Sequence, residues 1–274
     1  ELRPDLKVPL DPSDSADVFI AHCPERVLPG RVLQELVSND RIIGGITDRC
    51  AEKAMGLYQL FVRGECLRTN ARTAEMAKLT ENAFRDVNIA FANELSVICD
   101  RLGINVWDTI ALANRHPRVN ILQPGPGVGG HCIAVDPWFI VSSAPEESRL
   151  IRTAREVNDA KPQWVMDKVK AKAERFKDPV IGCLGLTFKA NIDDLRESPS
   201  LEIVHQLRNM NIGTVLACDP NVEPSKAPFP LHDLKDVIRQ SDILLLLVDH
   251  AEFLEVDPQL TKDKVVIDTR GAWK

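Results

Sequence analysis

Residues 73–101 hold the sequence feature that most restricts the fold, a run of apolar residues spaced three and four positions apart. The run consists of Met76, Leu79, Ala83, Phe84, Val87, Ala90, Phe91, Leu95 and Ile98. This spacing predicts one amphipathic helix, about 43 Å long at 1.5 Å per residue. Such a helix is longer than a small domain, so part of its apolar surface is more simply buried against a second copy of the chain than left in water. We therefore expect a homodimer through helix 73–101.

The segments that follow this helix extend a helical middle part. Gly103 is suited to end the long helix, and Asn105 to cap a second one that stops before Pro117. A loop rich in proline and glycine comes next. Helical spacing returns over 147–176, with an interruption expected near Pro162.

Alternating apolar runs and helical segments stand on both sides of this middle part. Before it, the candidate strands are 17–22, 41–46 and 65–69, and Asp48 could cap a helix that runs to about Phe61. After it, the candidate strands are 180–184, 214–217, 243–248 and 265–267, and the candidate helices are 199–210 and 233–240. These late strands are almost wholly apolar, as in a parallel sheet that helices cover on both faces.

The chain is therefore expected to have an α/β fold in three parts. The first is the remnant of a Rossmann-like sheet, since three strands are too few for an open α/β sheet. The second is the helical dimerisation part with its one long helix, and the third is a carboxy-terminal Rossmann-like α/β domain. The predicted boundaries are 1–71, 72–177 and 178–274.

Composition excludes several classes of function. The net charge is −6 and no long basic run occurs, which argues against a nucleic-acid-binding surface. The longest strongly apolar run, residues 243–248, is far too short to span a membrane. The seven cysteines are scattered and odd in number, which favours reduced thiols and a cytoplasmic location.

The densest chemical signal is the run Gly-Pro-Gly-Val-Gly-Gly-His-Cys at 125–132. Glycines let backbone N–H groups approach a ligand closely, and Cys132 follows them as a candidate nucleophile. Asp136 is four residues further on, within reach of Cys132 if the segment is helical. The alternative is a tight turn with a buried cysteine, which this pattern alone leaves about equally favoured. No CxxC, HxxxH or carboxylate cluster accompanies these residues, so no metal site is expected.

Other candidate residues have ordinary alternatives. Lys78, Asn82 and Arg85 share one face of the long helix, where a lysine could hold an alkoxide or act as a base or simply face solvent. The segment Cys-Pro-Glu-Arg at 23–26 ends a strand, where open α/β sheets bind ligands, although a loop ion pair is equally compatible. Residues 185–189 form a glycine turn with a lysine before a helix, a weak phosphate-binding pattern.

Four stretches together resemble the UDP-glucose/GDP-mannose dehydrogenase family, and the resemblance extends over the whole chain. They are CPERVLPG at 23–30, RTAEMAKLTENAFRDVNIAFANEL at 72–95, NRHPRVNILQPGPGVGGHCIAVDPWF at 114–139 and FKANIDDLRESP at 188–199. The resemblance implies that 1–71 is the end of an NAD-binding domain, 72–177 a catalytic and dimerisation domain, and 178–274 a UDP-sugar-binding domain. It also implies a four-electron oxidation of a UDP-sugar at C6, with two NAD reduced.

The resemblance assigns roles to individual residues. Cys132 would form a thiohemiacetal and then a thioester with the substrate, Lys78 and Asn82 would hold the C6 oxyanion, Asp136 would order water or the lysine, and Glu25 would assist hydrolysis. The residues implied to touch the nucleotide sugar are Arg26, Val27, Arg85, His116, Gly129, Lys189 and Arg270. Arg118 is implied to reach the site of a neighbouring subunit, and Arg196 to touch NAD.

Two departures from the family pattern refine these expectations. Pro29 stands where the glucose enzymes have a second glutamate, as in the branch of the family that acts on N-acetylhexosamines, which disfavours UDP-glucose as substrate. The overall resemblance implies UDP-N-acetyl-D-mannosamine and leaves UDP-N-acetylglucosamine open. The glycine-rich strand–turn–helix that binds NAD has no counterpart ahead of the first strand, so we expect a fragment that is inactive alone. A non-catalytic, dimeric UDP-sugar-binding module is therefore an alternative. A two-electron hydroxyacid dehydrogenase is disfavoured, since it needs no thioester-forming cysteine.

Overall fold

The computed structural model describes residues 5–27 and 31–273, in two compact units. One unit ends at Asn82 and the other begins at Ala83. Both contain α/β elements, and the predicted fold class is confirmed. The three-domain division drawn from the sequence stays a prediction.

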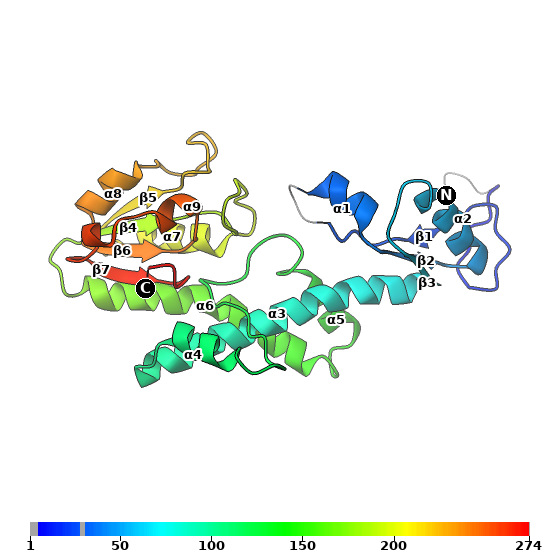
Figure 1. Ribbon diagram of the computed structural model, residues 1–274, viewed down its shortest axis with the longest axis horizontal. Helices are drawn as coiled ribbons and strands as arrows, with labels where there is room; N and C mark the ends of the chain where they lie inside the picture. Colours follow the sequence, from blue (N-terminus) through cyan, green and yellow to red (C-terminus); the bar gives the residue numbers. More distant parts are fainter. Residues whose placement is uncertain (1–4, 28–30, 274) are drawn as a thin grey trace. The chain divides into compact units, whose positions relative to one another are not determined.

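The first unit contains a three-stranded sheet in the order β1-β2-β3 (Figure 1). Its elements are β1 (Ala21–His22), α1 (Val32–Ser38), β2 (Arg41–Gly45), α2 (Asp48–Tyr58) and β3 (Cys66–Asn70). β2 and β3 are parallel, whereas β1 is antiparallel to β2. The two parallel strands therefore both direct their carboxyl ends to the same edge of the sheet.

Three expectations for this unit need correction. The strand expected over 17–22 is reduced to two residues, because only Ala21 and His22 pair with β2. Helix α1 was not foreseen, although Val32, Leu33, Leu36 and Val37 are spaced as on one helical face; it spans only seven residues and has no buried residue. Helix α2 is capped by Thr47, whose hydroxyl accepts the N–H of Cys50 at 3.2 Å, and Asp48 is its first residue.

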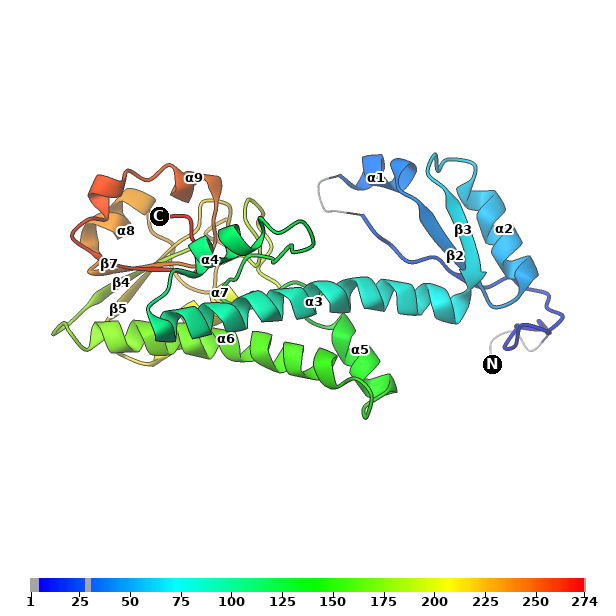
Figure 2. The same cartoon turned by 60° about the horizontal axis from the view of Figure 1, so that its bottom comes forward.

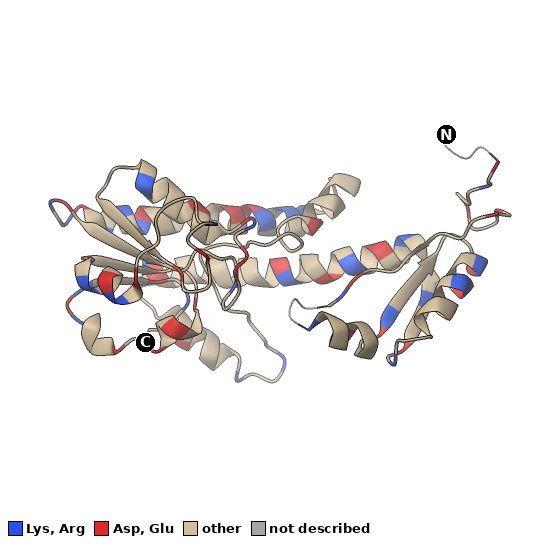
Figure 3. Ribbon diagram, turned by 90° about the horizontal axis from the view of Figure 1, so that it is seen from above, with Lys and Arg blue, Asp and Glu red and all other residues tan. Residues whose placement is uncertain are grey.

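The long helix is present as α3 (Ala71–Leu102), and Gly103 follows it with φ +68°. It runs beside α6 (Arg149–Ala173) (Figure 2). Residues 86, 93, 96 and 100 of α3 are hydrogen-bonded to residues 155, 158, 161 and 168 of α6, respectively. Because both sets of numbers rise together, the two helices are parallel. Acidic and basic residues are interspersed along both helices (Figure 3).

Two shorter helices complete the middle of the chain. Helix α4 (Val106–Ala113) is capped by Asn105, as predicted. Helix α5 (Asp136–Ser143) was not predicted as an element. The interruption expected near Pro162 is wrong, since α6 continues through it. The proline removes one helical hydrogen bond, but both flanking turns are held by packing.

The carboxy-terminal part contains a four-stranded parallel sheet in the order β5-β4-β6-β7. The strands are β4 (Val180–Leu184), β5 (Thr214–Cys218), β6 (Ile243–Leu246) and β7 (Val265–Asp268). The helices are α7 (Pro199–Asn209), α8 (Leu234–Gln240) and α9 (Ala251–Leu254), with a short 3-10 turn η1 (Pro258–Leu260). All strand pairs are parallel, as the apolar runs predicted.

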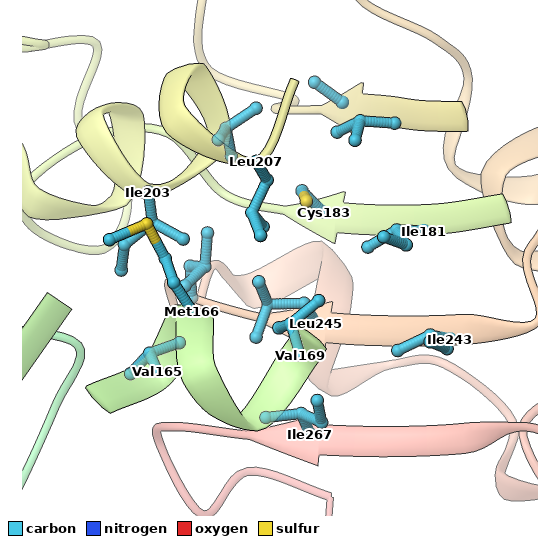
Figure 4. Packing of buried hydrophobic residues seen from close by; sticks show 14 of the residues in the cluster. Val165, Met166, Val169, Ile181, Cys183, Ile203, Leu207, Ile243, Leu245 and Ile267 are labelled. Atoms are coloured by element: carbon cyan, nitrogen blue, oxygen red, sulfur yellow. The ribbon is translucent and has the colours of Figure 1, made fainter. Parts of the chain in front are cut away.

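Two apolar clusters cover the two faces of this sheet. The larger one joins α6 and α7 to the sheet, with Val165, Met166 and Val169 of α6 packed beside Ile181 and Leu245 (Figure 4). The smaller one contains residues of α8 and α9. Helix α6 thus belongs to the core of the carboxy-terminal sheet as well as to the helical middle. No helix among the described residues has the length and apolar character needed to cross a membrane.

Candidate active site

The glycine-rich loop at 125–130 packs against the segment that leads into α7. A Cβ on Gly129 would lie 2.4 Å from the carbonyl oxygen of Glu197 and 2.6 Å from Cδ of Pro199. Gly130 adopts φ +85°, and a Cβ there would lie 3.0 Å from the ring of Phe188. A side chain would push this loop off its support, so the glycines are required for close packing between loop and domain.

Cys132 follows this loop on the surface of the protein. Its thiol is exposed, which excludes the alternative of a buried structural cysteine. Its carbonyl oxygen accepts the N–H of Asp136 at 2.8 Å, so residues 132–136 form one helical turn that leads into α5. Cys132 and Asp136 are therefore adjacent in space, as the spacing indicated.

Arg196 lies within electrostatic range of Cys132. Its guanidinium binds Asp194 through two nitrogens, with Nη2 at 2.6 Å from Oδ2. The hydrogen bonds that Arg196 donates to Asp194 are the main reason that the pKa of Arg196 is raised. The structure therefore places the positive charge of Arg196 within electrostatic range of the candidate nucleophile Cys132.

Lys189 and Arg270 come together at a small cavity beside the glycine-rich loop. The cavity has a volume of about 20 Å³, and Gly127 and Asp249 also line it. Arg270 donates from Nε to Asp249 at 2.8 Å, and Lys189 is exposed. Two cations from different strand ends thus face one glycine-rich turn, an arrangement suited to a diphosphate.

A buried hydrogen-bond network that sequence reasoning missed fixes the glycine-rich loop to the helices. The N–H of Gly125 donates to Asn93 at 2.9 Å, and Asn93 donates to Asn158 at 2.9 Å. Asn158 in turn donates to Asp86 at 2.8 Å, and Arg155 binds the same carboxylate oxygen at 2.6 Å. Asp86 and Asn93 lie seven residues apart on one face of α3, a polar repeat that could have revealed the network.

A second network orders the segment that contains Lys189. His250 is buried and accepts the backbone N–H of Asn191 at 2.9 Å, while its other ring nitrogen lies 3.2 Å from Asp219. Burial alone would raise the pKa of Asp219, but hydrogen bonds from His250 and from the N–H of Leu186 hold that pKa below its usual value. The hydrogen-bonded pair of His250 and Asp219 thus positions the turn after β4.

Two further candidates of the first unit, Glu25 and Arg26, each form an ion pair with another residue of that unit. Glu25 accepts from the buried Arg41 at 3.1 Å and from the N–H of Arg26 at 2.7 Å. Arg26 forms a 2.8 Å ion pair with Glu81. The loop ion pair considered as an alternative is therefore present. It also fixes the Glu25 carboxylate, whose side chain stays 57% exposed. Val27 is half-buried beside it.

The three polar candidates on α3 differ in exposure. Asn82 is buried, Lys78 is half-buried and Arg85 is exposed. A simple solvated stripe does not describe them, since only Arg85 is fully open to solvent. His116 and Arg118 lie in the exposed turns after α4, where the N–H of Arg118 donates to His116 Nδ1 at 3.3 Å.

Helices α2 and α3 follow the parallel strands of the first unit, and a side chain caps the first turn of each. The first turn of α2 is capped by Thr47 and contains Asp48, which forms an ion pair with Arg68 at 2.7 Å. The first turn of α3 is capped by Asn70, which accepts the N–H of Thr73 at 2.8 Å. Both caps occupy backbone N–H groups that a helix N-terminus otherwise offers to an anion.

No group of three or more histidine, cysteine, aspartate or glutamate side chains suited to a metal ion occurs in the described part of the chain.

Three domain families match the chain in order. Residues 5–62 match the NAD binding domain of the UDP-glucose/GDP-mannose dehydrogenase family, residues 72–160 its central domain and residues 182–274 its UDP binding domain. The cofactor predicted from the sequence, NAD, is the one that the first of these domains binds by description. Pro29 lies outside the described residues, although the domain match includes its position.

Relatives and solved structures agree with these matches. An NDP-N-acetyl-D-galactosaminuronic acid dehydrogenase of Ralstonia nicotianae is 63% identical over 99% of the chain and 65% of the relative. A UDP-N-acetyl-D-mannosamine dehydrogenase of Yersinia pestis is 56% identical over 100% of the chain and 68% of the relative. The structure of a UDP-N-acetyl-mannosamine dehydrogenase from S. aureus superposes with a TM-score of 0.85 at 48% identity, covering 94% of the chain and 62% of that structure. The chain thus spans 65% of the length of the first relative.

Proposed function

Since this chain belongs to the UDP-glucose/GDP-mannose dehydrogenase family, we propose that its protein oxidises a UDP-N-acetylhexosamine at C6 to the uronate. The substrate we propose is UDP-N-acetyl-D-mannosamine, with UDP-N-acetyl-D-mannosaminuronate as product. The observation that supports this most directly is the exposed Cys132 at the end of the glycine-rich loop, whose other side packs on the matched UDP binding domain.

Cys132 supplies the covalent chemistry in this proposal. The C6 alcohol loses a hydride and a proton to give an aldehyde, and the Cys132 thiolate adds to the aldehyde carbon to form a thiohemiacetal. Loss of a second hydride gives a thioester, and water releases the carboxylate and restores the thiol. NAD is the hydride acceptor in this family's reaction. A thiolate suits the sequence because it is both a good nucleophile and a good leaving group.

The other residues bind or orient in this proposal. Lys78 and Asn82 hold the C6 oxyanion, Asp136 orders water or the lysine, and Glu25 assists hydrolysis. The UDP-sugar contacts are Arg26, Val27, Arg85, His116, Gly129, Lys189 and Arg270, with Arg118 reaching a neighbouring subunit and Arg196 touching NAD. The pairing of Lys189 and Arg270 at one cavity supports the diphosphate contact.

A second substrate has support from the comparisons. The relative at 63% identity is named for N-acetyl-D-galactosaminuronic acid, whose C4 hydroxyl has the opposite configuration to that of the mannose series. A galacto-configured UDP- or other NDP-sugar is therefore the second candidate. UDP-N-acetylglucosamine and a purely binding role remain alternatives.

The test compares binding and turnover by the 274-residue chain. UDP is expected to bind, because the cavity residues and the glycine-rich loop belong to one compact unit. No NADH should form from NAD and any UDP-N-acetylhexosamine, because side chains cap the first turns of α2 and α3 and occupy N–H groups that a pyrophosphate would need. Calorimetry measures UDP binding, and absorbance measures NADH. Steady NADH formation would refute the expected inactivity of the 274-residue chain, and absence of UDP binding at millimolar concentration would refute the nucleotide site.

We further propose a homodimer through α3, and the exposed side chains of the helix support it. Phe84, Phe91, Ile98 and Leu102 are 68%, 57%, 46% and 64% exposed, and they follow one face at steps of seven, seven and four residues. A stripe of this kind on a soluble domain marks an interface.

Phe91→Glu is expected to shift the protein from dimer to monomer at micromolar concentration, because it places a charge in the centre of the stripe. Arg101→Glu, which introduces the same residue outside the stripe, should leave the dimer intact. Light scattering distinguishes the two masses. A wild-type chain that is folded but monomeric would contradict the dimer.

A further inference from the structure

A pocket that the proposed reaction does not use lies between α3, α4, α6 and β7. Its volume is about 530 Å³, within the range of small-molecule sites. The residues on which the argument rests are Ser96, Ile104, Trp107, Lys161, Trp164 and Val266, all lining the pocket and all in the second unit. None of them has a role in the reaction proposed above.

The floor of this pocket contains a buried ammonium group with neutral partners. Lys161 is only 4% exposed. Its Nζ donates to the hydroxyl of Ser96 and lies 3.8 Å from the ring centre of Trp164. Ser96 donates its hydroxyl proton to the carbonyl oxygen of Asn93 at 2.6 Å. The Ser96 oxygen is therefore the acceptor of the hydrogen bond from Lys161. A buried charge without a counter-ion is costly, and burial with the nearby Lys168 lowers the pKa of Lys161 to about 7.

The two carboxylates that line the pocket already have partners. Asp100 forms an ion pair with Lys168, which lines the pocket as well. The carboxylate of Asp268 accepts the backbone N–H groups of residues 270, 271 and 273 at 2.7 to 2.8 Å. Lys172 also lines the pocket. Three ammonium groups and two carboxylates therefore line the pocket, and within the described residues Lys161 and Lys172 form no ion pair with either carboxylate.

The wall of the pocket is apolar where it meets solvent. Ile104 is 51% exposed and Val266 is 37% exposed, and Trp107, whose indole packs against Gly271, also lines the pocket. A pocket with cations at the floor and apolar side chains at the mouth suits a ligand with an anionic head and a flat apolar body.

We propose that this pocket binds a small organic anion, whose carboxylate or phosphate contacts Lys161 and Lys172 and whose apolar ring lies against Trp107, Ile104 and Val266. The site is separate from the UDP-sugar contacts, and the inference does not depend on the reaction. It adds a second ligand site to the unit that contains the nucleotide-binding domain.

The first experiment titrates the full chain with naphthalene-1-sulfonate in calorimetry, with UDP present at saturation to fill the nucleotide site. One molecule per chain is expected to bind. Lys161→Met should weaken binding at least about tenfold, since a charge-assisted hydrogen bond contributes roughly 1.5–3 kcal/mol. Lys170→Met, which removes the same charge from an exposed position on α6 outside the pocket, should leave binding unchanged.

The second experiment uses pH, because the sulfonate stays ionised throughout. Below about pH 7 Lys161 is protonated in the free protein, so the anion binds without proton uptake. At higher pH binding must take up a proton, and the affinity should fall by up to about tenfold per pH unit. Lys161→Met should remove this dependence. The other charged groups that line the pocket with Lys161 are Asp100 of α3, Lys168 and Lys172 of α6 and Asp268 of β7.

Further ligands and a second variant separate the possible explanations of the binding. Naphthyl phosphate and naphthoate, compared at one pH, show which head group the site prefers, while inorganic phosphate tests whether the ring is needed. Lys172→Met, a half-exposed position, replaces Lys161→Met if that variant fails to fold. Equal affinity of the wild type and both lysine variants, loss of binding when UDP is added, or no binding at millimolar concentration would each overturn the proposal.

Discussion

Cys132→Ala is expected to abolish uronate formation in a form of the protein that has a complete NAD-binding domain. Without the thiolate no thiohemiacetal forms, and the aldehyde has no route to a thioester. The uronate is measured by chromatography after incubation with NAD and UDP-N-acetyl-D-mannosamine. Because Cys132 is exposed and makes no side-chain contact in the core, the substitution should leave the thermal midpoint of unfolding nearly unchanged.

The control for this prediction is Cys66→Ala. Cys66 is a half-exposed cysteine on β3, away from the glycine-rich loop in sequence. It should keep normal activity. Undiminished uronate formation by Cys132→Ala would remove Cys132 from the mechanism, and loss of activity in both variants would point to a general effect of thiol removal.

Arg155→Met is expected to lower the free energy of unfolding by about 3–5 kcal/mol. Arg155 is 2% exposed and its partner Asp86 is fully buried, so the substitution leaves a buried carboxylate without its cation. The same carboxylate anchors Asn158, which holds Asn93 and through it the N–H of Gly125. Urea unfolding followed by tryptophan fluorescence gives the value.

Two companion variants separate the causes. Arg149→Met removes an exposed arginine from the first turn of the same helix, and its effect should stay within about 0.5 kcal/mol. Asp86→Leu combined with Arg155→Met removes both charges, and should recover most of the lost stability. A loss below about 1 kcal/mol for Arg155→Met would show that the pair contributes little to folding.

The sequence predicted the parts of this fold that repeat a pattern. Helix α3 and the four parallel strands follow from apolar periodicity, because burial on one face or on both faces selects the residues directly. The expected caps at Gly103 and Asn105 follow from local backbone chemistry. The wrong expectation at Pro162 shows the limit of such rules, since α6 receives enough packing from the sheet to continue through a missing hydrogen bond.

The sequence singles out the candidate chemical residues of the site, whose roles stay predictions, and it does not reveal the residues that support them. Cys132, Lys189 and Arg270 stand beside glycines at the ends of elements, which is a local signal. Asp86, Arg155 and Asn158 come from helices more than sixty residues apart in sequence, and each alone resembles an ordinary helical polar residue. Only their meeting between α3 and α6 shows that they hold the loop.

The continuity of α6 has a consequence for how this protein can be recombined with its relatives. The matched central domain ends at residue 160 and the UDP binding domain begins at 182, so the border between the two sequence modules falls inside one helix that runs to Ala173. Its first half binds α3 through polar groups and its second half fills the core of the sheet. A chimaera joined at residue 160 would therefore divide α6 between its two parents. A chimaera joined near residue 177, past the helix, would exchange the nucleotide-binding domain whole. It would still replace the sheet without replacing α6, whose apolar residues cover one face of that sheet.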